Sequence, residues 1–203
     1  VTSYFALEHI PEPRATVAHV RSLLKDDGVF YGIVPDTFGN PGDFFVLDHV
    51  NHFTSASLHA LLREAGFQRI EIDAAVHRGA LVFSASPYGT ATPCPDPQTE
   101  FERGVALARH WHHINERLQR AEASARSGPA AIYGSGFYGA YITSSLQDPS
   151  RIQCYLDRNP FLQGRQLFGK PILTPQSLPE EVRTLYIGLN PSVARTTMAE
   201  MSW

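Results

Sequence analysis

The sequence predicts an α/β protein with two domains, joined by a linker and a long helix. In the first 88 residues, short apolar runs alternate with amphipathic helical patterns, which is typical of a doubly wound α/β sheet. The stretch 86–97 then places four prolines and a glycine among small polar residues, so no regular element is expected there. A glycine-rich turn after the apolar run 130–133 begins a second α/β pattern. The predicted domains are therefore 1–88 and 128–203, with 89–127 as linker and helix.

Composition and charge argue against several functional classes. The 203 residues are 43% hydrophobic and 18% charged, as in globular proteins that bury a core. A net charge of −3 and the lack of a Lys/Arg run argue against nucleic acid as a partner. Neither a membrane span nor a signal peptide is recognisable, so we expect a cytoplasmic protein without a membrane partner. Cys94 and Cys154 are too isolated to predict a disulfide framework or a zinc ribbon.

The elements of the first domain follow from the spacing of apolar residues. In "EPRATVAHVRSLLKDDG", one helical face is expected to hold Val17, Val20, Leu23 and Leu24, with Pro13 in the first turn and Gly28 past the end. Around this helix we expect a strand in "YFALEHIPEP", a strand in "VFYGIVPD", a helix in "SASLHALLREAG" capped by Thr54 or Ser55, and strands in "FQRIEIDAAV" and "GALVFSASP".

The second half of the chain begins with the long helix. Residues 98–128 contain no proline, and their apolar residues recur every three or four positions. Histidines 110, 112 and 113 on this helix are interpreted as one solvated patch. Strands are then expected in "AAIY", "IQCYLDRNP" and "RTLYIGLNP".

Gly134, Gly136 and Gly139 form a Gly-x-Gly-x-x-Gly pattern between an apolar strand and a helix. In Rossmann-like domains the first glycine permits a tight turn, the second lets a phosphate approach the backbone, and the third lets the helix pack on the strand. Asp157, at the end of the next strand, stands where an acid would meet a ribose hydroxyl. Binding of a nucleotide or nucleotide-sugar is the preferred interpretation. The alternative is a Rossmann-like domain that keeps its glycines for packing alone.

Two clusters of titratable residues in the first domain are candidates for chemistry. Glu8 and His9 end a predicted strand, where open α/β sheets bind their ligands. Asp48, His49 and His52 lie in a loop before a helix, and imidazoles there suit acid–base catalysis or substrate orientation. Structural roles stay open for both clusters, since Glu8 could bridge to a neighbour and the loop could serve in part to cap the helix. His-x-x-His in an irregular loop is not a specific zinc signature, so no metal ligand is predicted.

Seven stretches form a pattern that is more specific than any one of them. They are "ALEHIPEP", "LLKDDGVFYGIVPD", "DHVNHFTSASLHALLREAGF", "VHRGALVF", "YGSGFYG", "YLDRNPFLQGRQLFGKPIL" and "LYIGLNP". In this order they resemble the sugar C-methyltransferases, which pair a class I S-adenosylmethionine-dependent domain with a C-terminal Rossmann-like domain that helps to hold a nucleotide-linked deoxysugar. The resemblance implies the C-terminal portion of such an enzyme, with the cofactor-binding motif mostly outside this chain.

This resemblance sets expectations for the fold and the cofactor. The first domain should hold a partial class I methyltransferase sheet with an open edge, which a second copy of the chain or another segment would cover. The chain alone is expected to be inactive and to bind S-adenosylmethionine weakly or not at all.

The resemblance also implies roles for individual residues. A base would remove a proton from a carbon beside a ketone, with His52 or His9 as the base and His49 as the third candidate. Asn51 occupies the position of the family's acid, so the resemblance leaves Asp48 as the acid of the site. The substrate-binding residues that we predict are Glu8, Asn51, His77, Arg78, Gly134, Gly136, Gly139, Asp157, Asn159 and Asn190.

Three functions therefore compete. The first is an S-adenosylmethionine-dependent C-methyltransferase acting on a nucleotide-linked sugar or a similar small molecule. The second is a non-catalytic module in which residues 128–203 bind a nucleotide-sugar. The third is an NAD-dependent oxidoreductase that uses the three glycines, and it is least favoured because no Tyr-x-x-x-Lys follows them.

Overall fold

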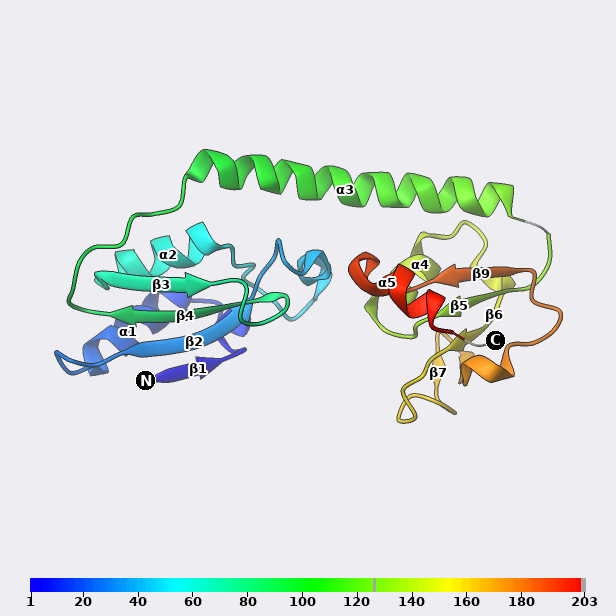
Figure 1. Cartoon of the computed structure of the whole chain (residues 1–203), viewed down its shortest axis with the longest axis horizontal. Helices are drawn as coiled ribbons and strands as arrows, with labels where there is room; N and C mark the ends of the chain where they lie inside the picture. Colours follow the sequence, from blue (N-terminus) through cyan, green and yellow to red (C-terminus); the bar gives the residue numbers. More distant parts are fainter. Residues whose placement is uncertain (126, 202–203) are drawn as a thin grey trace. The chain divides into compact units, whose positions relative to one another are not determined.

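A computed structural model describes residues 1–125 and 127–201. The chain divides into two compact units, Val1–Arg109 and His110–Trp203, and the boundary falls inside the long helix α3 (Pro97–Ser124). Each unit has its own sheet, which confirms the predicted α/β class (Figure 1).

Unit 1 holds a four-stranded sheet in the order β1-β2-β4-β3. β1 (Thr2–Tyr4) runs parallel to β2 (Phe30–Pro35). β4 (Ala80–Ser86) is antiparallel to both β2 and β3 (Arg69–Asp73). β1 lies at one edge of this sheet, and β2 is its one partner strand among the described residues.

Helices α1 (Pro13–Leu23) and α2 (Ser55–Glu64) pack on one face of this sheet (Figure 1). α1 begins with proline at its first position, as predicted. Thr54 is the N-cap of α2: its hydroxyl accepts the backbone N–H of Ser57, whose own hydroxyl accepts the N–H of Thr54. The shared core contains Val17, Phe30, Val34, Leu58, Leu62, Ile70, Leu81 and Phe83.

The first predicted strand is shorter than expected. β1 ends at Tyr4, and Phe5 takes a φ of 47°, a left-handed conformation that ends the extended backbone. The chain then forms a 3-10 turn, η1 (Leu7–His9), in which Leu7 and Glu8 are buried. Glu8 and His9 therefore lie on a turn just beyond the carboxyl end of β1.

Unit 2 holds a five-stranded sheet in the order β7-β8-β6-β5-β9. The strands β5 (Ala130–Tyr133), β6 (Ile152–Leu156), β8 (Lys170–Leu173) and β9 (Thr184–Ile187) are parallel, and β7 (Gln166–Leu167) is antiparallel to β8. The helices are α4 (Phe137–Ser145), which follows β5, and α5 (Pro191–Ala199), which follows β9.

Both faces of the sheet in unit 2 are covered. Ala130 and Ile132 of β5 belong to one apolar cluster, and Ala131 and Tyr133 belong to a second cluster. Because successive side chains of a strand point to opposite faces, β5 is buried on both sides, as its uninterrupted apolar sequence requires.

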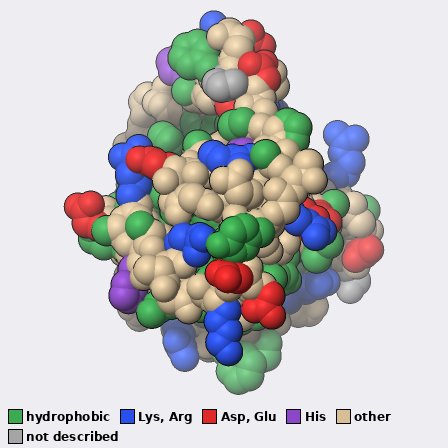
Figure 2. All heavy atoms as spheres, turned by 90° about the vertical axis from the view of Figure 1, so that its left-hand side faces the viewer, with side chains coloured by type: hydrophobic (Ala, Val, Ile, Leu, Met, Phe, Trp, Pro, Cys, Tyr) green, Lys and Arg blue, Asp and Glu red, His purple; other side chains and the backbone are tan. Residues whose placement is uncertain are grey.

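Within the described residues, no helix is both long enough and apolar enough to cross a membrane. On the face shown in Figure 2, Lys and Arg side chains are interspersed with Asp and Glu side chains. This mixed surface agrees with the near-balanced charge of the sequence.

Candidate functional site

A buried carboxylate organises the loop between β2 and α2. Asp43 is 0% exposed and lies in the 3-10 turn η2 (Pro41–Phe45). Its Oδ1 lies 2.6 Å from Nδ1 of His49, and its Oδ2 lies 3.0 Å from Nδ1 of His52. Thr37 donates its hydroxyl to the same Oδ2. Because a carboxylate can only accept, each imidazole carries its proton on Nδ1 and keeps Nε2 for other contacts.

Sequence reasoning selected Asp48 and missed Asp43. The side chain of Asp48 is 76% exposed, and its carboxylate lies 3.6 Å from Nδ1 of His9. The acid that contacts both His49 and His52 is Asp43 instead. The sequence carries one signal for Asp43, which stands between a glycine and two phenylalanines ("GDFF"). An acid among apolar neighbours is seldom buried unless another group pairs with it.

Glu8 and His9 reach the same place from the end of β1. The rings of His9 and His49 meet edge to face, with centroids 4.9 Å apart. Nε2 of His9 lies 3.9 Å from Oε1 of Glu8, and Nδ1 of His9 lies 2.9 Å from the backbone oxygen of Asp48. Strands β1 and β2 are parallel, so their carboxyl-terminal ends lie on the same side of the sheet. The segments that follow these two ends bring the three histidines together.

The Glu8 carboxyl is buried and only partly satisfied. Glu8 is 1% exposed, and its Oε2 has no hydrogen-bond partner among the described residues. Burial raises the pKa of Glu8 above its ordinary value, and nearby Asp43 acts in the same direction. The backbone N–H of Glu8 and the imidazoles of His9 and His49 oppose this rise in the pKa.

Asn51 ties the two segments together. Its side-chain amide donates to the backbone oxygens of Leu7 at 3.0 Å and Ile10 at 2.6 Å. Its backbone N–H donates to the oxygen of Glu8 at 3.0 Å. The structure thus shows that Asn51 positions the turn that carries Glu8 and His9, while the predicted contact with a substrate stays a prediction.

The turn between β3 and β4 lies beside the carboxyl-terminal end of β2. Ala80, the first residue of β4, pairs with Pro35, the last residue of β2. His77 in this turn is exposed and packs its ring against Phe5. Arg78 is also exposed. Both residues are therefore within unit 1, and their predicted role toward a substrate is untested.

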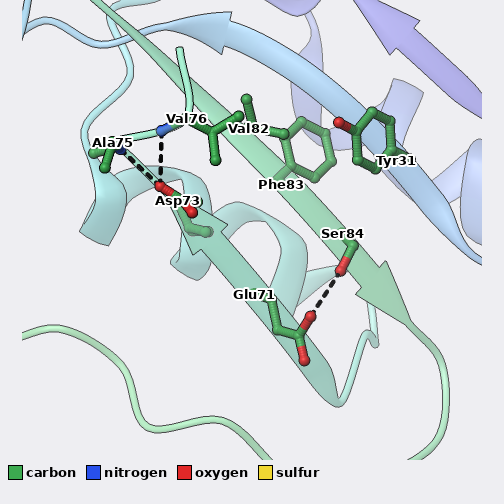
Figure 3. Close-up of a pocket in the computed structure, with 10 residues that line it drawn as sticks. Tyr31, Glu71, Asp73, Ala75, Val76, Val82, Phe83 and Ser84 are labelled. Carbon is green, nitrogen blue, oxygen red and sulfur yellow. Dashed lines mark hydrogen bonds between the residues drawn. The ribbon is translucent and has the colours of Figure 1, made fainter. Parts of the chain in front are cut away.

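Two hollows in unit 1 differ in the chemistry that they offer. One of about 580 Å³ is lined by Asn51 and His52 together with residues of α1 and α2. The other, of about 730 Å³, lies on the strands β2, β3 and β4 (Figure 3). Its one glutamate, Glu71, bonds to Arg69 and Ser84, and the bond from Arg69 lowers the pKa of Glu71. None of the predicted site residues lines this second hollow, so the first is the better candidate for a substrate.

In unit 2 the three glycines have different surroundings. Gly134 has a φ of 98°, and a Cβ there would collide with the backbone oxygen of Gly188. A Cβ on Gly139 would collide with the backbone oxygen of Gly134. Gly136, the N-cap of α4, has nothing within 4 Å of its Cβ position. Turn geometry and packing therefore explain Gly134 and Gly139 but not Gly136.

Asp157 supports this glycine turn. Its carboxylate accepts the N–H and the hydroxyl of Ser135, at 2.9 and 2.6 Å, and the N–H of Asn159 at 2.9 Å. Burial alone would raise the pKa of Asp157, but these hydrogen bonds outweigh it and lower the pKa below its ordinary value. Asn159 in turn accepts the N–H of Phe161, and Asn190 directly precedes α5. A contact between Asp157 and a ribose stays a prediction.

Two comparisons with known proteins bear on this site. Residues 1–72 match the family model described as "Methyltransferase domain". The second comparison finds a similarity to the C-methyltransferase NovU of Streptomyces niveus. The identity is 25% over an alignment of 201 positions, which covers 88% of this chain and 48% of that protein. Both comparisons support a methyltransferase. The chain thus spans about half the length of the curated relative it matches. The family match contains Glu8, Asp43, His49 and His52.

Proposed function

We propose that the chain is part of a methyltransferase that adds a methyl group to carbon in a small molecule, with a nucleotide-linked ketosugar as the preferred substrate class. The observation that carries the proposal is the carboxylate of Asp43, which fixes the imidazoles of His49 and His52 beside Glu8 and His9. Transfer of a methyl group to carbon requires a carbanion, and a carbon beside a ketone becomes one when a base removes its proton. The relative's description as a C-methyltransferase supports this choice.

In this proposal His52 is the base. Its Nδ1 donates to Asp43, so the carboxylate orients the ring and stabilises the imidazolium that forms when Nε2 takes a proton. His52 is 29% exposed and lines the hollow of about 580 Å³, where a small substrate can reach it. His9 and His49 are the second and third candidates for the base, and a protonated imidazole from either could donate to the enolate oxygen.

S-adenosylmethionine would supply the methyl group, but neither the connection 5–12 nor the backbone at Gly39 offers it an open glycine turn. The connection 5–12, from β1 to α1, contains no glycine. In the connection from β2 to α2, a Cβ on Gly39 would meet the carboxylate of Asp36, so the backbone there is already covered. The proposal is therefore confined to the removal of the proton, and no step is assigned through the cofactor.

We propose that unit 2, taken by itself, binds a nucleotide. The open space at Gly136, at the N-terminus of α4, supports this role because the free N–H groups of a helix N-terminus favour a phosphate. A hollow of about 400 Å³ in the same unit is lined by Trp111, Tyr138 and Tyr141, whose rings offer surfaces for stacking a base.

Proton removal can be tested without the methyl donor. The full chain is incubated in D2O with a panel of nucleoside-diphosphate-linked ketosugars, and deuterium uptake at the carbon beside the ketone is followed by mass spectrometry. His52→Gln should slow the enzyme-dependent exchange by at least about 100-fold, the usual contribution of a general base. His19→Gln, an exposed histidine of α1, is the matched control and should leave the exchange unchanged.

The outcome also separates the competing functions. If the unmodified chain catalyses no exchange on any member of the panel but binds a ketosugar, the non-catalytic binding module replaces the enzyme. If His9→Gln abolishes the exchange and His52→Gln does not, the base is His9 and the assignment of His52 is wrong.

A further inference from the structure

Glu8, His9 and His49 each offer one atom that could ligate a metal ion. These atoms all lie within 4.8 Å of one another. The three residues come from segments far apart in the sequence, and Asn51 and the edge-to-face contact between the two rings hold them together.

The hydrogen bonds around the two imidazoles determine which ring nitrogen of each is available to a metal ion. Nδ1 of His49 bonds to Oδ1 of Asp43, and Nδ1 of His9 bonds to the backbone oxygen of Asp48. Histidines that bind metals commonly donate their other ring N–H to a carboxylate or a backbone carbonyl in this way, which fixes the tautomer and turns the second nitrogen to the metal. Both imidazoles therefore present Nε2 with a free lone pair.

The remaining member of the group lacks a partner. Oε2 of Glu8 is buried and accepts no hydrogen bond among the described residues. A buried carboxylate oxygen without a donor is destabilising unless a proton or a cation meets it. A cation bound by the Glu8 carboxylate beside the two imidazoles would offset the cost of burying this group.

We propose that Glu8, His9 and His49 bind a divalent transition-metal cation of the Zn²⁺ or Co²⁺ type. Two imidazoles and one carboxylate suit these ions, whereas Mg²⁺ and Ca²⁺ prefer sites made of oxygen alone. Metal–ligand bonds of about 2.0–2.1 Å place neighbouring ligands of a tetrahedral site about 3.3 Å apart. The ligand atoms, which lie within 4.8 Å of one another, must therefore approach by up to about 1.5 Å.

The site would keep a position open for a further ligand. Three protein ligands leave the fourth place of a tetrahedral ion to water or to a substrate oxygen. His9 is 40% exposed and His49 is 15% exposed, so solvent reaches this side of the group. An ion at this position would polarise a ketone in place of a protonated His9 or His49, a consequence that rests on the proposed function. Binding of the metal itself does not depend on that function.

This ligand set differs from the one considered in the sequence. Among the described residues, Glu8, His9 and His49 form the one group of this kind, and His52 is not a member of it. The His-x-x-His spacing would pair His49 with His52, whereas the group in the structure combines His49 with Glu8 and His9. The expectation of no metal was based on that loop alone.

The test measures metal binding in the absence of substrate. The parent protein carries His112→Gln and His113→Gln, which remove exposed histidines of α3 that could bind zinc adventitiously. After treatment with a chelator, the parent is titrated with Zn²⁺ by calorimetry and with Co²⁺ by visible absorption. We expect one equivalent to bind.

Variants of the parent then locate the ion. Glu8→Gln, His9→Gln and His49→Gln should each weaken binding by more than about 100-fold, because each removes a ligand. Asp43→Asn should weaken it by about 10–100-fold, as is typical of an outer partner. His52→Gln is the matched control, since it removes an imidazole bound to the same Asp43, and it should still bind one equivalent. Circular dichroism of each variant establishes that it is folded.

Two results would overturn the proposal. One is a parent that binds neither ion, and the other is a folded Glu8→Gln variant with the parent's affinity and Co²⁺ spectrum. The proposed function is tested separately by deuterium exchange. A failure of metal binding therefore counts against the metal site alone, and a failure of exchange counts against the proposed function alone.

Discussion

Glu8 combines burial, a nearby acid and an unsatisfied oxygen, and its raised pKa has a consequence for stability. When the folded state raises the pKa of a carboxyl group, ionisation is easier in the unfolded chain. The folded protein therefore loses stability as the pH rises through the ordinary pKa toward the folded one, and this loss persists at higher pH.

Glu8→Gln removes that charge with little change in shape. In the metal-free protein, the variant should be more stable than the wild type at about pH 8, and the difference should disappear near pH 4. Urea denaturation at both pH values, with a chelator present, measures the difference in the free energy of unfolding between the variant and the wild type. A variant that is less stable than the wild type by the same amount at both pH values would show that a neutral hydrogen bond is lost instead of a charge.

The sequence indicated which residues belong to the candidate site better than it indicated the contacts that these residues make. His9, His49 and His52 were identified from local pattern, and the structure brings all three to one edge of the sheet. The contacts of Asp43 and Asn51 were missed. The amide of Asn51 bonds to backbone oxygens 41 and 44 residues away, and a single sequence carries no signal of such pairings.

Elements were predictable where local physics fixes them. Helix α2 begins where its capping box requires, and the buried strand β5 follows from an uninterrupted apolar run. The short pair β7 and β8 was not foreseen, because β7 has two residues and β8 contains Pro171. Strands this short show no alternation, and proline in a strand argues against the assignment.

The turn between β5 and α4 yields a prediction that separates packing from binding. Gly136→Val places its side chain in open space, so the fold should be retained, while the branched side chain occupies the position that a phosphate would need. Gly139→Ala should instead destabilise unit 2 by about 1–3 kcal/mol, because its Cβ meets the backbone of Gly134.

Calorimetric titration with uridine and thymidine diphosphates, together with thermal denaturation, distinguishes the two variants. We expect Gly136→Val to lose nucleotide binding at an unchanged melting temperature, and Gly139→Ala to melt earlier. If Gly136→Val binds nucleotide as tightly as the wild type, the glycine motif serves packing alone.

For the whole molecule, the sequence predicts a linker and helix at 89–127 between two domains. The boundary between the compact units, between Arg109 and His110, falls inside this segment and within α3. The apolar spacing along this helix is continuous, so it does not show which residues are buried. Phe101 is 67% exposed while Trp111 is 6% exposed and meets Phe137 and Tyr141. Periodicity predicts a helical face but not what covers it.

The two units have separate apolar cores, and the last prediction concerns their cooperativity. The core of unit 1 contains Leu58 of α2, and a core of unit 2 contains Ile132 of β5, both 0% exposed. Replacing either residue by alanine should remove about 2–5 kcal/mol of stability from its own unit. Differential scanning calorimetry should resolve two transitions, with Leu58→Ala lowering one and Ile132→Ala lowering the other. The two variants are matched controls for each other, because each leaves the other core intact. A single transition that both variants lower equally would show that the chain unfolds as one cooperative unit.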